Sequence, residues 1–159
     1  MVCSTFFMYI NIHQAQKKDM RKRRFPYITY FRNQEVTSFP DGLTTIESRA
    51  FLGTALQTVI LPDTVTTIES GAFLGSAIES IVLPDGLRTI EEYAFAACLN
   101  LRKIYLPKGL ERIGKGAFLG CARLESVEIP ENILFIGEDA FAFCQNISLF
   151  LNINPGDSL

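Results

Sequence analysis

A repeat of 22 or 23 residues runs through most of the chain and constrains its fold more than any other feature. Prolines stand at positions 40, 62, 84, 107 and 130, and Ala-Phe pairs end at positions 51, 73, 95, 118 and 141, so both series advance by 22, 22, 23 and 23 residues. A fixed period of this size is typical of a solenoid, in which each repeat is one coil that contacts only its neighbours. We therefore expect about five stacked coils.

Each repeat carries a short alternating segment before its proline. The segments read QTVIL, ESIVL, RKIYL and ESVEI, with apolar residues at every second position. This pattern predicts a β-strand with one buried face. Equivalent strands of neighbouring coils should pair in parallel about 4.8 Å apart. The proline, which has no N–H to donate, should end each strand.

After each proline comes a second apolar pair, such as Val65 and Ile68, and then the Ala-Phe pair. We interpret the Ala-Phe pair and its flanks as one helical turn, in which Ala permits close approach and Phe fills the centre of the coil. The phenylalanines of this column should stack as a continuous spine: Phe51, Phe73, Phe95, Phe118 and Phe141.

Taken together, these columns resemble the BspA-type leucine-rich repeat, whose pattern is L-x-x-I-x-L-P-x-x-L-x-x-I-x-x-x-A-F-x-x-C-x-x-L. One copy matches it at Leu101, Ile104, Leu106, Pro107, Leu110, Ile113, Ala117, Phe118, Cys121 and Leu124. The first two copies depart from it, because Thr54 and Ser76 stand where Cys is usual. The resemblance implies a curved right-handed solenoid. It also implies roles in protein interaction, often in adhesion at a cell surface, and no enzyme activity.

We therefore predict an α/β repeat solenoid: a right-handed leucine-rich-repeat solenoid of about five coils, with short parallel strands and helical turns. Residues 39–151 should form this solenoid. Residues 1–38 are expected to be a basic N-terminal arm that also supplies a cap, and residues 152–159 a C-terminal tail or a truncated further repeat. The C-terminal end of the stack should be thinly covered, which favours self-association through the solenoid ends.

Charge is distributed unevenly along the chain. Residues 1–38 hold seven basic and two acidic residues, a net charge of +5, whereas the remainder has a net charge of −7. A basic run of this kind can bind nucleic acid or an anionic membrane, although most such runs are solvated tails. The run comprises Lys17, Lys18, Arg21, Lys22, Arg23 and Arg24.

Two observations on location point in opposite directions. The resemblance implies a cell surface. The apolar start of the chain, however, lacks the positive region that precedes the core of a signal peptide. The second observation favours a cytoplasmic protein, and the compartment stays open.

The outward positions of the strands before the prolines are the best candidates for a binding surface. Solenoids bind partners on such extended sheet faces, and three of these positions would form an exposed apolar stripe, which can mark an interface. An alternative reason for the stripe is that β-branched and aromatic residues suit strands. The candidates are Thr58, Ile60, Ser80, Val82, Lys103, Tyr105, Ser126 and Glu128.

No motif for catalysis, a cofactor or a metal is present in the sequence. The one histidine, His13, stands far from other candidate ligands. Cys98, Cys121 and Cys144 share a column, which we interpret as one of buried free thiols because only a small residue is needed there. Glu47, Glu69 and Glu91 share another column, either a solvated acidic ladder or a weak calcium site.

The sequence therefore predicts a non-catalytic protein–protein interaction module that binds through its strand face, with cell-surface adhesion as the sharper version. The alternative is an intracellular or nuclear protein whose basic arm binds nucleic acid or an anionic membrane. The protein ligand itself is not identified.

Overall fold

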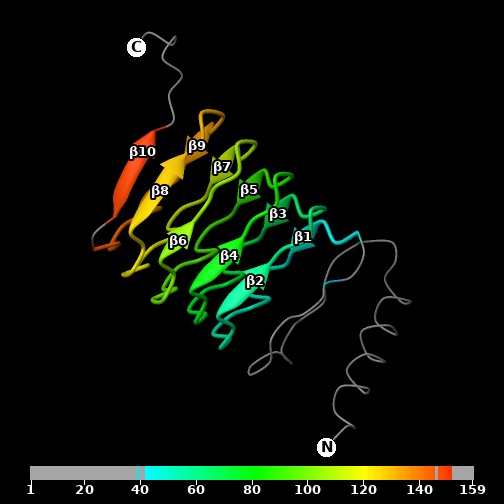
Figure 1. Cartoon of the computed structure of the whole chain (residues 1–159), viewed down its shortest axis with the longest axis horizontal. Coiled ribbons are helices and arrows are strands. Elements are labelled where there is room, and N and C mark those ends of the chain that lie inside the picture. Colours follow the sequence, from blue (N-terminus) through cyan, green and yellow to red (C-terminus); the bar gives the residue numbers. More distant parts are fainter. Residues whose placement is uncertain (1–38, 40–41, 146, 152–159) are drawn as a thin grey trace, which may run out of the picture.

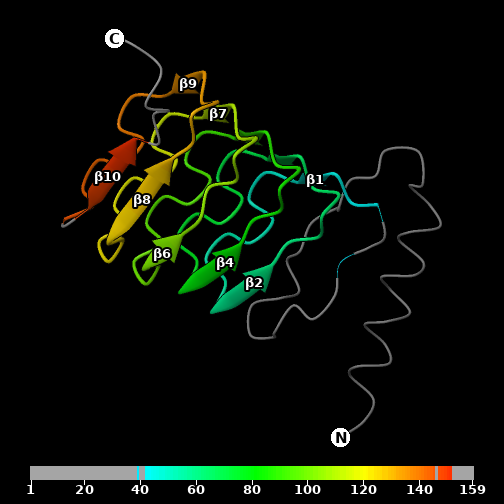
Figure 2. The ribbon, with the colours of Figure 1, turned by 45° about the horizontal axis from the view of Figure 1, so that its top comes forward.

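The computed structural model describes residue 39, residues 42–145 and residues 147–151. Within these residues the chain winds into about five stacked coils, as expected, and each coil crosses two parallel sheets (Figures 1 and 2). The basic arm and cap expected over residues 1–38, and the tail expected over residues 152–159, lie outside the described residues.

The segments before the prolines form one sheet, which we call the pre-proline sheet. All its strands run parallel, in the order β10-β8-β6-β4-β2. In β2 and β4 the side chains alternate between buried and exposed, as the period-two pattern predicts, whereas all four side chains of the last strand, β10, are exposed. The strands are β2 (Thr58–Ile60), β4 (Ser80–Val82), β6 (Lys103–Ile104), β8 (Ser126–Ile129) and β10 (Ser148–Leu151).

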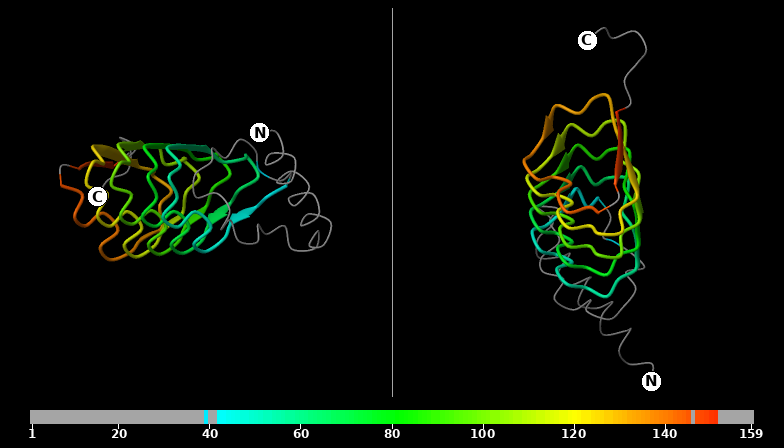
Figure 3. Two further views of the ribbon diagram at one scale, coloured as in Figure 1. Left: turned by 90° about the horizontal axis from the view of Figure 1, so that it is seen from below. Right: turned by 90° about the vertical axis from the view of Figure 1, so that its left-hand side faces the viewer.

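A second sheet, which we call the post-proline sheet, lies on the opposite side of the coils (Figure 3). The sequence predicted an inward-facing apolar pair here but not a strand. Its strands are two residues long and parallel, in the order β1-β3-β5-β7-β9. They are β1 (Thr45–Ile46), β3 (Thr67–Ile68), β5 (Thr89–Ile90), β7 (Arg112–Ile113) and β9 (Phe135–Ile136).

The Ala-Phe segment is a succession of tight turns, so the predicted helical turn, and with it the α/β class, is wrong. In the second coil the N–H groups of Gly71, Phe73 and Gly75 donate to carbonyls of the next coil, at 2.9, 2.7 and 2.8 Å. The N–H groups of Ala72 and Leu74 instead donate to carbonyls three residues back. Gly71 and Gly75 adopt φ of 64° and 65°. A left-handed residue at every fourth position prevents a right-handed helix from propagating.

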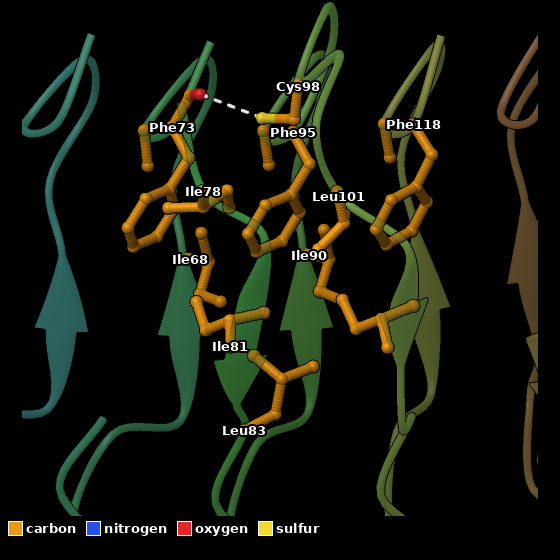
Figure 4. Close-up of a cluster of buried hydrophobic side chains, with 14 of the residues drawn as sticks. Ile68, Phe73, Ile78, Ile81, Leu83, Ile90, Phe95, Cys98, Leu101 and Phe118 are labelled. Atoms are coloured by element: carbon orange, nitrogen blue, oxygen red, sulfur yellow. Dashed lines mark hydrogen bonds between the residues drawn. The ribbon is translucent and has the colours of Figure 1, made fainter. Parts of the chain in front are cut away.

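The phenylalanine spine is confirmed and forms the centre of the core. Neighbouring rings from Phe51 to Phe141 stack nearly parallel, with centroids 4.8, 5.1, 5.2 and 5.2 Å apart. Figure 4 shows the three central rings, Phe73, Phe95 and Phe118. The first four rings are fully buried. Isoleucines of the two sheets pack beneath them from both sides, for example Ile68 and Ile81. Each coil therefore adds one layer to a continuous apolar core.

The change from a 22-residue to a 23-residue coil arises in one loop. Ser76 and Cys98 occupy the same column, with their side chains 3.4 Å apart. Ser80 follows Ser76 by four positions, but Lys103 follows Cys98 by five. Ser80 nevertheless lies opposite Lys103 in the parallel register of β4 and β6. The loop after Cys98 thus absorbs the added residue without a shift in the sheet.

Candidate interaction surface

The outer face of the pre-proline sheet carries two columns of side chains, and all eight predicted binding positions lie on it. Parallel register places Thr58 opposite Ser80 and Ile60 opposite Val82, and it continues through β6 and β8. The first column is Thr58, Ser80, Lys103 and Ser126, and the second is Ile60, Val82, Tyr105 and Glu128.

The second column is the predicted apolar stripe. Ile60, Val82 and Tyr105 are 65%, 55% and 78% exposed, although they follow one another on three successive coils. Glu128 interrupts the stripe, and Phe150, which lies opposite Glu128 on β10, extends it. Sequence reasoning missed Phe150. The alternation in the segment ISLFL could have indicated it, but no proline follows that segment within the regular spacing.

The first column is polar and partly linked by hydrogen bonding. The hydroxyls of Thr58 and Ser80 lie 3.3 Å apart. Lys103 adds a cation at the centre of the column, beside the exposed ring of Tyr105 on the same short segment. The face therefore combines a strip of apolar groups with a parallel strip of hydrogen-bonding groups.

The outer face of the post-proline sheet is ionic by contrast. The guanidinium of Arg112 lies 3.7 Å from the carboxylate of Glu91 and 4.3 Å from the ring centroid of Phe135. A carboxylate oxygen of Glu69 accepts the backbone N–H of Ser48 at 3.0 Å. The predicted column of glutamates is thus engaged with protein groups. Within the described residues, no three His, Cys, Asp or Glu side chains come together to hold a metal ion.

The cysteine column is buried and its thiols are free, as predicted. Each thiol donates to the backbone carbonyl of the phenylalanine one coil earlier, so size alone does not describe this column. Burial raises the pKa of the Cys98 thiol to about 11, so this group is protonated and poorly nucleophilic at neutral pH. The Sγ–O distances are 3.1 Å from Cys98 to Phe73, 3.1 Å from Cys121 to Phe95 and 3.2 Å from Cys144 to Phe118.

The sequence profile of the BspA type leucine rich repeat region matches residues 26–148, with six copies. The chain belongs to the BspA-type leucine-rich repeat family. The match begins ahead of the first Ala-Phe repeat and counts one copy more than the five Ala-Phe pairs that recur every 22 or 23 residues. Members of this family are typically non-catalytic repeat proteins, and leucine-rich repeat proteins generally mediate protein interactions.

Two solved structures of bacterial leucine-rich repeat proteins show the same fold. A leucine-rich repeat protein of T. pallidum is 37% identical, covers 72% of this chain and superposes with a TM-score of 0.68. A leucine-rich cell surface protein from Faecalibacterium prausnitzii is 31% identical, covers 77% of this chain and also superposes with a TM-score of 0.68. This BspA-type chain spans 56% of the first protein and 32% of the second. Among curated proteins, none matches the chain.

Other candidate groups of this BspA-type chain lie outside the described residues. They are the basic run over residues 17–24 and the single histidine, His13. In the described part of the chain, no helix has the length and apolar character needed to cross a bilayer.

Proposed function

We propose that this BspA-type chain is a non-catalytic recognition module that binds a protein ligand through the outer face of its pre-proline sheet, in adhesion at a cell surface. The observation that supports this most directly is the stripe of Ile60, Val82 and Tyr105. Ile60 and Val82 stand exposed in register on β2 and β4, and the exposed Tyr105 directly follows β6 on the next coil, although the core beneath them is buried.

The energetics of such a contact fit the composition of the face. Burial of one large apolar side chain contributes about 1.5–3 kcal/mol, so three in a row can supply a substantial part of a binding free energy. Tyrosine is among the residues most enriched at binding hot spots. Because the strands are held in register before binding, little conformational entropy is lost when the ligand docks. The hydroxyls of Thr58 and Ser80 offer hydrogen bonds beside the stripe.

The surface location rests on a relative. The solved protein from Faecalibacterium prausnitzii is described as a cell surface protein, and an exposed apolar stripe suits contact with host or neighbour-cell proteins. Protease treatment of intact source cells tests this location. Loss of the region over residues 39–151 before lysis supports adhesion, and protection until lysis contradicts it.

The binding face itself is tested by a photo-crosslinking amino acid placed at position 82 on the pre-proline sheet, with position 89 on the post-proline sheet as a matched control. The probe is the detergent-solubilised surface protein of the neighbouring cells. We expect a discrete crosslinked product from position 82 and none from position 89.

A charge placed in the stripe sharpens this test. Crosslinking from position 60 should be lost when Val82→Lys is introduced and retained with Thr89→Lys. Equal products from both sheets, or products that survive Val82→Lys, contradict the proposed face. If binding disappears only when residues 17–24 are deleted, and falls steeply with added salt, the basic run is the binding element instead.

A further inference from the structure

One carboxylate interrupts the apolar stripe of the pre-proline sheet, and an aromatic residue stands on each side of it. Lys103 lies opposite Ser126. Tyr105 and Glu128 follow these two residues by two positions each, so they are also in line on neighbouring coils. Glu128 in turn lies opposite Phe150 on β10. We call Tyr105, Glu128 and Phe150 the aromatic–carboxylate trio.

The trio belongs to three neighbouring coils, whose strands β6, β8 and β10 lie side by side (Figure 2). Tyr105 and Phe150 are 78% and 56% exposed, and Glu128 is exposed between them. Paired strands lie about 4.8 Å apart, so each aromatic residue is about one strand spacing from the glutamate. A cation is attracted to an aromatic face within about 6 Å of the ring centroid. A cation bound at Glu128 is therefore within reach of both rings.

The carboxylate of Glu128 differs from those on the other sheet. On the post-proline sheet, three carboxylates lie 3.1 to 3.8 Å from a cationic side chain of a neighbouring coil. These pairs are Arg88 with Glu111, Arg112 with Glu91 and Lys115 with Glu138. Among the described residues, none forms an ion pair or a hydrogen bond with the side chain of Glu128. This carboxylate is thus open to a cation that a ligand brings.

The molecule itself contains the complete combination on its other face. The guanidinium of Arg112 lies 4.3 Å from the ring centroid of Phe135, which is opposite it on β9. The same guanidinium lies 3.7 Å from the carboxylate of Glu91 on the preceding coil. One arginine thus engages a ring and a carboxylate across three successive coils. The trio presents rings and a carboxylate on three successive coils and leaves the place of the arginine open.

The surrounding charge favours a cationic ligand group. From residue 39 onward the chain has a net charge of −7, which attracts cations over a distance. Two basic residues lie near the trio, at the start of β6. Arg102 is bonded through its backbone to the coils of Glu79 and Glu125 on either side, so acidic residues flank it. Lys103 stands in the polar column and opposes a cation at Glu128.

We propose that the trio binds an arginine side chain of the protein ligand, with the guanidinium paired to Glu128 and lying between the rings of Tyr105 and Phe150. This inference rests on the proposed function, because it names the chemistry of the ligand that the pre-proline sheet binds. Arginine fits better than lysine, since its planar guanidinium pairs with a carboxylate through two hydrogen bonds and also stacks on aromatic faces. Ile60 and Val82 contact apolar side chains of the same ligand.

The spacing of the columns determines the probe. Three strand spacings, about 14 Å, separate Ile60 from Glu128. An extended segment rises about 3.4 Å per residue, so an arginine four residues from an apolar side chain covers the same distance. The probes are two short peptides, acetyl-LTVTRT-amide and the reversed acetyl-TRTVTL-amide, which represent the two directions across the sheet. The matched controls carry citrulline, which has the shape of arginine without its charge.

Titration of the isotope-labelled full chain, followed by NMR, tests the site. We expect the ring signals of Tyr105 and Phe150 and the amide signal of Glu128 to shift with at least one arginine peptide and not with its citrulline counterpart. The shifts should weaken as salt rises from roughly 50 to 500 mM. No response to either arginine peptide, or equal responses to citrulline, overturns the proposal. So do ring signals that respond only to deletion of residues 17–24, because the chain's own basic run then fills the site.

Substitutions on the exposed face separate the contacts. Glu128→Gln should raise the dissociation constant of the peptide about threefold or more. Tyr105→Leu, which keeps an apolar side chain but removes the ring, should raise it about twofold or more. Lys103→Gln removes the opposing charge and should lower it. The matched control is Glu125→Gln, which removes the same charge from an exposed position of the same coil and should change little. An equal effect of Glu125→Gln, or reversed signs for Glu128 and Lys103, overturns the site.

The crosslinking from position 82 distinguishes failure of this inference from failure of the proposed function. If Glu128→Gln keeps that crosslink unchanged and the peptides cause no shift, the sheet face remains the binding surface and the arginine site is overturned. If the arginine peptides shift the signals of the trio but position 82 yields no crosslink, the arginine site is supported and the proposed function is contradicted.

Discussion

At the scale of single residues, the column that ends in Cys98, Cys121 and Cys144 couples each coil to the one before it. The thiols donate to a carbonyl one coil back, whereas Thr54 donates within its own coil, to the carbonyl of Phe51 at 3.1 Å. The carbonyls of Phe73 and Phe95 also accept a backbone N–H, from Ser76 and Cys98 respectively. Each thiol therefore adds a second hydrogen bond to a buried carbonyl, which Ala at the same position could not supply.

Removal of one ring from the middle of the spine should be the most damaging single truncation. Phe95 is fully buried between two stacked rings, 5.1 and 5.2 Å away. Phe95→Ala should lower the free energy of unfolding by about 3–5 kcal/mol, because the cavity cannot close between fixed coils. Urea denaturation measures the difference. Phe150→Ala, at an exposed ring, should change it by less than about 1 kcal/mol, and equal losses would contradict the role of the spine.

The buried thiol of Cys98 should make stability depend on pH above neutrality. Its pKa is raised from 9.0 to about 11, chiefly by burial. The unfolded chain loses this proton first, so the native state binds more protons between these values and the free energy of unfolding falls as pH rises from about 9 to 11. Cys98→Ser has no thiol at this position and should lose less stability over the same interval. Parallel urea curves for both proteins would refute this.

At the scale of the elements, glycines mark where neighbouring coils approach closely and where the backbone turns. A Cβ on Gly114 would lie 2.6 Å from backbone atoms of Glu91 and Glu92. Gly120 has a φ of 72°, and a Cβ there would meet nothing within 4 Å. Within one coil, Gly114 therefore reports on close packing between coils, and Gly120 reports on the cost of the left-handed backbone conformation.

Substitutions at these glycines should therefore differ in cost. Gly120→Ala should lower the free energy of unfolding by about 1–2 kcal/mol, the penalty of the left-handed conformation. Gly114→Ala should cost clearly more, because backbone atoms of the adjoining coil must move apart. Thermal denaturation of the two variants, measured together, checks the order. The reverse order would show that the coils are free to separate.

The sequence predicted the elements that extend over enough residues to show a period. The pre-proline strands alternate over four or five residues, and both their positions and their outward faces are confirmed. The post-proline strands are two residues long, too short for alternation. In addition, Leu43 and Ile46 are three residues apart, the spacing of a helix face. The positions with a left-handed backbone could not be recognised from the sequence either, because Arg49 and Tyr93 occupy a column that holds glycine in other coils.

The candidate surface followed from the sequence for a similar reason, and its limits are physical as well. Successive side chains of a strand point to opposite faces of the sheet, so the outward positions of Ile60 and Tyr105 could be predicted from the sequence. Exposure at the end of the stack depends on what lies beyond a coil. No single repeat encodes this, so the sequence predicted a thinly covered C-terminal end but not which side chains, such as Leu149 and Leu151, are exposed there.

At the scale of the whole molecule, stability should decline toward the C-terminal end. Each coil contacts only its neighbours, and the last coil has a neighbour on one side within the described residues. Amide hydrogens of β10 should therefore exchange faster than those of β4, as measured by hydrogen exchange and mass spectrometry. Uniform exchange along the stack would contradict this gradient.

The loop after Cys98 has a consequence for counting residues along this chain. The added residue of a 23-residue coil leaves the sheet register intact, whereas the same addition inside a strand would turn every following side chain to the other face. Length is thus free to vary in that loop and fixed in the strands. A comparison of two such chains should be anchored strand by strand, with gaps placed after the cysteine column. A fixed 22-residue ruler would exchange inside and outside in β6, where it is off by one residue, and would assign every residue from Ser126 onward to a position two places away.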